Sequence, residues 1–80
     1  MSVRFERAAQ RQIRRFSKTD ASAVADAIER FANTSVGDVK KLKGHPPRWR
    51  LRVGRFRIVF DYEFDGIHVL AVTDRKDAYR

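Results

Sequence analysis

The sequence contains no cysteine, and only four glycines and two prolines interrupt its 80 residues. Without cysteine the fold cannot depend on disulfides or on thiolate metal ligands, and a reducing cytoplasm is the expected location. No run of about 18 apolar residues and no apolar signal-peptide region occurs, so we expect neither a membrane span nor export. A chain this short predicts a single domain over residues 1–80.

Acidic residues are scarce relative to basic ones. The chain carries 18 Lys and Arg against 10 Asp and Glu, which gives a formal net charge of +8 at pH 7. This surplus is more than solubility asks of a small domain, and it indicates a polyanionic partner. Charge alone leaves nucleic acid, an acidic protein and an anionic membrane open as that partner.

Apolar spacing predicts a strand at residues 2–5 and then two helices. Apolar side chains recur every three or four positions over residues 6–16 and again over residues 20–34, which is the rhythm of amphipathic helices. Thr19 and Asp20 are the expected N-caps of the second helix, because either side chain can accept a backbone N–H. The two helices are predicted to form a hairpin with one apolar side.

From Trp49 onward, apolar and charged residues alternate with a period of two, which predicts half-buried strands. Gly54 and the Asp65-Gly66 pair are the expected turns. The preceding residues 35–48 contain two glycines and both prolines and predict a loop. The predicted segments are strands at 49–53, 56–62 and 67–73, followed by a polar tail at 74–80.

These elements follow the order β-α-α-β-β-β. We therefore predict an α+β domain in which the helical hairpin covers one face of an antiparallel sheet and leaves the other face open. The aromatic residues Trp49, Phe56, Phe60 and Tyr62 share the phase of the aliphatic strand residues. That phase predicts core packing for them rather than base stacking.

The open face is predicted to be basic. No acidic residue occurs between Lys40 and Arg57, a stretch that is rich in Lys and Arg. Strand alternation places Arg50 and Arg52 on the face opposite the apolar residues, and the hairpin is expected to bring Arg55 and Arg57 onto that same face. Because arginine suits bidentate phosphate contact, this face is predicted to bind a nucleic-acid backbone.

Two alternatives to nucleic-acid binding remain open for this face. It could be an ordinary surface on which Asp61, Glu63, Asp65 or Asp74 pairs with some of the arginines. It could also be a docking face for an acidic protein segment, which is compatible with RNA binding.

The sequence shows no Ser-His-Asp or Cys-His set, no phosphate-binding glycine loop and no zinc-ligand spacing. His45 and His68 are far apart and have no convincing co-ligands, so we expect no metal and no small-molecule cofactor. Any catalysis must then come from Arg, Lys and Tyr, with help from Asp or His. Tyr79 could stack on a base, share a proton or simply fix the terminus.

Four stretches resemble, in order, the RelE/ParE toxin superfamily of type II toxin–antitoxin systems. They are Lys41–Gly44, Trp49–Gly54, Phe56–Phe60 and Val72–Tyr79. The resemblance implies a RelE-like fold, a cytoplasmic toxin and a cognate antitoxin. In the RelE branch it further implies a ribosome-dependent mRNA endoribonuclease, or mRNA interferase, that acts in the ribosomal A site. The family's reaction is metal-independent attack of the ribose 2′-OH on the adjacent phosphate.

The resemblance also implies roles for individual residues. Arg50 stands where some relatives have a lysine proposed as general base, and an arginine is a poor proton acceptor. Asp74 stands where many relatives have histidine. The expected catalytic residues are Arg50, Arg52, Arg57, Arg75 and Tyr79. The expected RNA-binding residues are Lys40, Lys41, Lys43, Arg48, Arg55, Lys76 and Arg80.

Two other functions are compatible with the same residues. A ParE-like toxin would inhibit DNA gyrase without nuclease activity, using the same fold. A degenerate member would bind only its antitoxin or RNA, which the missing lysine and histidine favour.

Overall fold

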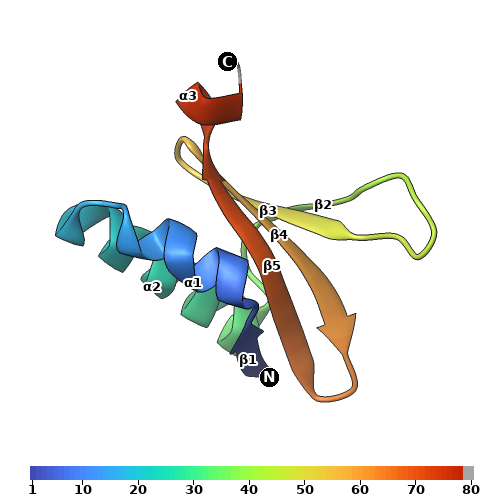
Figure 1. Ribbon diagram of the computed structural model, residues 1–80. Helices are drawn as coiled ribbons and strands as arrows, with labels where there is room; N and C mark the ends of the chain where they lie inside the picture. Colours follow the sequence, from blue (N-terminus) through green and yellow to red (C-terminus); the bar gives the residue numbers. More distant parts are fainter. Residues whose placement is uncertain (79–80) are drawn as a thin grey trace.

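The computed structural model describes residues 1–78 and confirms the predicted α+β class, with two helices on one side of a sheet (Figure 1). Its elements are, in order, β1 (Ser2–Phe5), α1 (Arg7–Arg14), α2 (Lys18–Thr34), β2 (Asp38–Lys41), β3 (Trp49–Val53), β4 (Phe56–Glu63), β5 (Gly66–Asp74) and α3 (Arg75–Ala78). None of these helices is long and apolar enough to cross a lipid bilayer.

The five strands form one sheet in the order β1-β5-β4-β3-β2. All neighbours are antiparallel except β1 and β5, which are parallel, so the sheet is mixed. Parallel neighbours need a long crossover connection, and the helical hairpin that follows β1 is part of it. A side chain on Gly66 would place its Cβ 1.9 Å from the carbonyl oxygen of Ser2. Gly66 therefore allows β1 to approach, whereas Gly54 has the positive φ of 56° expected of a turn.

Both helices have slightly different limits from those predicted. The N-cap of α2 is Ser17, whose Oγ accepts the backbone N–H of Asp20 at 3.1 Å. The prediction of Thr19 or Asp20 as the cap was wrong. The helix begins earlier than predicted, at Lys18, so Ser17 is the residue whose side chain can accept a backbone N–H of the first turn. At the other end, Ser35 adopts a left-handed conformation with φ of 61° and closes the helix.

Two elements were not predicted from the sequence. Strand β2 lies within residues 35–48, which were expected to be a loop, and it pairs antiparallel with β3. Its Asp-Val-Lys-Lys sequence has one apolar residue, so it shows almost no alternation. The short helix α3 lies in the expected polar tail, and Asp74 Oδ1 accepts the N–H of Lys76 at its start.

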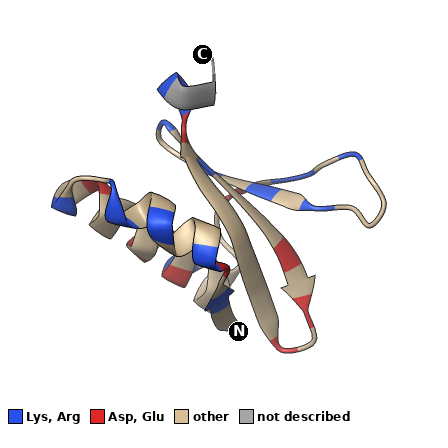
Figure 2. Ribbon diagram, viewed as in Figure 1, with Lys and Arg blue, Asp and Glu red and all other residues tan. Residues whose placement is uncertain are grey.

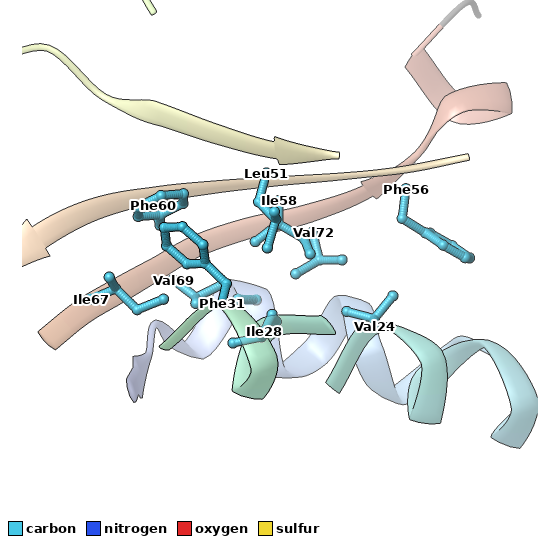
Figure 3. Close-up of a cluster of buried hydrophobic side chains, with 11 residues drawn as sticks. Val24, Ile28, Phe31, Leu51, Phe56, Ile58, Phe60, Ile67, Val69 and Val72 are labelled. Atoms are coloured by element: carbon cyan, nitrogen blue, oxygen red, sulfur yellow. The ribbon is translucent and has the colours of Figure 1, made fainter. Parts of the chain in front are cut away.

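The core lies between the helical hairpin and the sheet (Figure 3). Phe60 is completely buried, and its ring centroid is 5.4 Å from that of Phe31 on α2. The core placement predicted for Phe56 and Phe60 is confirmed. For Tyr62 it was wrong, because this side chain is 46% exposed at the margin of the core, where it packs edge-on against the half-buried Trp49. The helices therefore leave the end of this face uncovered.

Candidate functional site on the open sheet face

The sheet face opposite the helices carries cations at one end and acids at the other. Figure 2 shows Lys and Arg on β3 and along the β2–β3 loop, and acidic residues around the β4–β5 turn. The register aligns Asp38, Arg52, Arg57 and Thr73 across four neighbouring strands. We call these four residues the arginine row. Neighbouring strands are about 4.8 Å apart, so the row forms a continuous polar track across the sheet.

Arg52 and Arg57 are the centre of the arginine row. They are direct cross-strand partners, and both side chains are exposed. Within the described part of the chain, neither forms an ion pair. Like charges placed directly opposite each other are destabilising. A bound anion would therefore relieve the repulsion between these two arginines. Their predicted placement on the open face is confirmed.

Arg50 lies in the next row, opposite Lys40 on one side and Val59 on the other. Unlike its neighbours it is buried, with 9% of the residue exposed. Its Nη1 lies 3.8 Å from Asp38 Oδ2 and has no hydrogen-bond partner among the described residues. A buried N–H without an acceptor costs free energy, so this atom favours an incoming acceptor such as a phosphate oxygen.

Arg55 does not lie on this face, and the prediction that it does was wrong. Its Nε donates to Asp74 Oδ2 at 2.9 Å and its Nη2 to Asp20 Oδ2 at 2.6 Å. Arg55 lies in the turn before β4, outside the strand alternation, and these two carboxylates draw it to the helix side. Its hydrogen bond holds the pKa of Asp74 below the usual value, and the same bond raises the pKa of Arg55. Arg55 thereby ties α2 to the end of β5.

The alternative in which acids pair with some arginines is correct for part of the surface. Asp74 binds Arg55, and Asp61 lies 3.9 Å from Arg48. It does not account for the centre of the arginine row, where the described residues supply no paired carboxylate. The molecule therefore carries arginines that are paired with carboxylates as well as arginines for which the described residues supply no such partner.

The other predicted RNA-binding residues are more scattered. Lys40 lies beside Arg50, but Lys41 is on the opposite face, with its Nζ 5.9 Å from the centroid of the Trp49 ring. Lys43 is exposed in the β2–β3 loop. Arg75 and Lys76 are exposed at the start of α3, beyond the β5 end of the row, whereas Tyr79 and Arg80 lie outside the described residues.

Sequence reasoning missed Asp38, the acidic residue in the arginine row. The acid-free stretch begins two residues later, and Asp38 joins the row only because β2 pairs with β3. With one apolar residue, the Asp-Val-Lys-Lys segment carries no alternation that would have indicated an edge strand.

Sequence reasoning also missed a polar cluster at the other end of the face. There Arg4 forms an ion pair with Glu63, and its hydrogen bond lowers the pKa of that carboxyl group. His68 Nε2 lies 3.0 Å from Glu6 Oε2, and its Nδ1 lies 3.2 Å from Arg4 Nη2. Among the side chains that the structure describes, no three acidic or histidine residues are arranged to hold a metal ion.

A cleft of about 680 Å³ lies between the helical corner and the end of β5, where Thr73 of the arginine row is part of its lining. It is lined by residues of the α1–α2 corner, together with Arg55 and the end of β5. The cations within it are not all available, because Arg55 is bound by two carboxylates. The centre of the arginine row, by contrast, lies on the open sheet face, which suits an extended polyanion.

Comparison with known proteins gives a consistent picture. Residues 3–79 match the family described as ParE toxin of type II toxin–antitoxin system, parDE. The fold is similar to the RelB–RelE antitoxin–toxin complex from Methanococcus jannaschii, with a TM-score of 0.76, 25% identity and coverage of 95% of this chain and 94% of that one. No curated protein sequence matched the chain.

Two further solved structures share the fold. One is the archaeal RelE–RelB complex from Pyrococcus horikoshii OT3, with a TM-score of 0.74, 18% identity and coverage of 91% and 92% of the two chains. The other is the toxin–antitoxin complex RelBE2 from Mycobacterium tuberculosis, with a TM-score of 0.73, 22% identity and coverage of 92% and 96%.

Proposed function

This chain belongs to the ParE toxin family of type II toxin–antitoxin systems. We propose that, within these systems, it is a ribosome-dependent mRNA endoribonuclease. The observation that carries this proposal is the Arg52–Arg57 pair, which has no ion-pair partner among the described residues, beside the buried Arg50 with its unpartnered Nη1. Such a cluster is suited to a phosphodiester. The likeness to RelE complexes in overall fold also favours the RelE branch.

The proposed chemistry is attack of a ribose 2′-OH on the adjacent phosphate. The products are a 2′,3′-cyclic phosphate and a 5′-OH. Arg50, Arg52 and Arg57 stabilise the negative charge that develops on the phosphate oxygens, and such electrostatic stabilisation is often the largest catalytic contribution. Arg75 and Tyr79 are proposed to complete the site from the C-terminal side.

The proposed partners are mRNA in the ribosomal A site and a cognate antitoxin. The three similar structures are toxin–antitoxin complexes, which supports an antitoxin for this chain as well. An acidic antitoxin segment would neutralise the arginine row and block RNA. We place both proteins in the cytoplasm, where translating ribosomes are found.

Toe-printing of translating ribosomes tests the proposal. The wild-type protein should cleave mRNA in the A site, and Arg57→Ala should abolish the cleavage product. Arg4→Ala is the matched control, since it removes an arginine from the paired end of the same face. Intact mRNA with the folded wild-type protein would contradict the proposal.

A second candidate function is inhibition of DNA gyrase. It is favoured by the matching family model, which is named for ParE toxins. A supercoiling assay distinguishes the two functions directly. Gyrase inhibition by the purified protein, without RNA cleavage on ribosomes, would reverse the ranking. Absence of both activities, together with normal growth on induction, would favour a degenerate member that binds only antitoxin or RNA.

A further inference from the structure

The proposed reaction needs a proton acceptor, and the arginine row contains a group that can serve. The attacking 2′-OH must lose its proton as the new bond forms. Arginine cannot take it, because the high pKa of its guanidinium group keeps that group protonated in proteins. Asp38, by contrast, is a carboxylate at the β2 end of the arginine row. The inference developed from this residue rests on the proposed function.

The position of Asp38 follows from the strand register. Its Cα partner is Arg52, which in turn is the partner of Arg57. With strands about 4.8 Å apart, the backbones of Asp38 and Arg57 are about 10 Å apart across the sheet. Side chains on the same face at this spacing can contact opposite sides of one nucleotide.

The surroundings of Asp38 leave it accessible to substrate. Its side chain is 65% exposed, and Oδ2 is 3.8 Å from Arg50 Nη1, which is longer than a hydrogen bond. Asp38 is thus within ion-pair distance of Arg50 but is not hydrogen-bonded to it, and its carboxylate stays open to solvent. A phosphate bound by Arg50 and Arg52 would bring the neighbouring ribose toward this carboxylate.

The other carboxylates near the site whose side chains the structure describes are occupied or badly placed. Asp74 is 4% exposed and binds Arg55, and Glu63 binds Arg4. Asp61 lies on the open face but is four residues along β4 from Arg57, about 13 Å at strand spacing, and its Oδ1 is buried. Among the carboxylates whose side chains the structure describes, Asp38 is the one in the arginine row.

We propose that Asp38 is the general base of the cleavage reaction. Its carboxylate takes the proton of the 2′-OH, and the 2′-oxygen forms a bond to phosphorus. The bond between phosphorus and the 5′-oxygen breaks, and that oxygen leaves with the electron pair and takes a proton from water. No redox change and no further reactant are needed.

Asp38→Asn tests this role, because the amide has the shape of the carboxylate but cannot accept the proton. On programmed ribosomes we expect kcat for mRNA cleavage to fall about 100-fold, within the range that general bases contribute. Binding of RNA should not weaken, because the change removes a negative charge from a cationic face. Asp26→Asn, on the exposed side of α2, makes the same charge change as a control and should cleave at the wild-type rate.

Asp38→Glu provides a second variant and should recover part of the lost kcat. A merely structural role predicts the opposite division, with weaker RNA binding and an unchanged kcat. If the wild-type protein cleaves mRNA and Asp38→Asn is fully active, the role of Asp38 is overturned but the proposed function stands. Failure of the folded wild-type protein to cleave would remove the proposed function itself, and the role of Asp38 with it.

Discussion

The two ends of the open sheet face use arginine in opposite ways. At the β4–β5 turn, Arg4 is paired with Glu63 and contacts His68. At the far end, Arg52 and Arg57 are opposite each other, and no carboxylate among the described residues pairs with them. All of these arginines are exposed or partly exposed on the same face of one sheet. The two ends therefore differ in whether a described carboxylate pairs with the arginines, and not in the type of residue present.

This difference indicates which charges serve the fold and which serve binding. An arginine with a nearby carboxylate already has its counter-ion and contributes to the stability of the free protein. Repulsion within an unpaired cluster raises the free energy of the free protein. A bound polyanion relieves that repulsion and so stabilises the complex. Activity and stability should therefore respond in opposite directions at the two ends.

The largest expected effect comes from Arg52→Gln compared with Arg4→Gln. Loss of Arg52 should lower the rate of A-site cleavage about 100-fold, as removal of one transition-state donor commonly does, and should not lower the thermal unfolding midpoint. Arg4→Gln should leave cleavage within about twofold of wild type, because its charge is already neutralised. Equal losses of activity in the two variants would show that pairing does not separate the two ends.

The next prediction compares the two faces of β4. Ile58 is completely buried under the helices, whereas its neighbour Val59 is half-buried on the open face. Ile58→Ala should lower the free energy of unfolding by about 3 kcal/mol through lost burial and a residual cavity. Val59→Ala should cost about 1 kcal/mol or less. Urea denaturation measures both, and similar costs would mean that the open face is covered by something in the free protein.

Much of this architecture could be predicted from the sequence, because strand alternation is strong where one face is buried. The hairpin of β3 and β4 and the placement of Arg50, Arg52 and Arg57 follow from a period of two. The covering helices follow from their apolar stripes. These predictions depend on local pattern alone, and they hold because burial enforces the pattern.

The residues that were misplaced depend on contacts between distant segments. Strand β2 has one apolar residue and exists through its pairing with β3, so Asp38 could not be assigned to the site from sequence. Arg55 was assigned to the wrong face because Asp20 and Asp74 are 35 and 19 residues away along the chain. Alternation cannot predict such long-range polar contacts.

A smaller effect is expected at the helix cap that the sequence did not identify. Ser17→Ala removes the hydroxyl that accepts the Asp20 N–H, and it should lower the free energy of unfolding by about 1 kcal/mol. Ser22→Ala, at an exposed position within α2, is the matched control and should be neutral or slightly stabilising because alanine favours helix. A neutral Ser17→Ala would return the capping role to Thr19 or Asp20.

The smallest effect should appear in acid, at the paired arginine that ties α2 to β5. The hydrogen bond from Arg55 lowers the pKa of Asp74 below its ordinary 3.8 in the folded protein, and burial opposes it only in part. A depressed folded pKa means that the pair stabilises the protein fully above the ordinary value. That stabilisation is lost as the pH falls through the folded value. Unfolding free energies measured from pH 6 to pH 2 should therefore decline less steeply for Asp74→Asn than for wild type.

Arg55→Gln should flatten the same acid limb, because it removes the first cause of the pKa shift. In the double variant the slope should match that of either single change, since both remove one interaction. If Asp74→Asn declined as steeply as wild type, the acid sensitivity would arise elsewhere, with the Arg4–Glu63 pair at the opposite end as the next place to test. The pH experiment thus tests a paired arginine on the helix side by stability, whereas the Arg52 and Arg4 variants compare the two ends of the open face by activity.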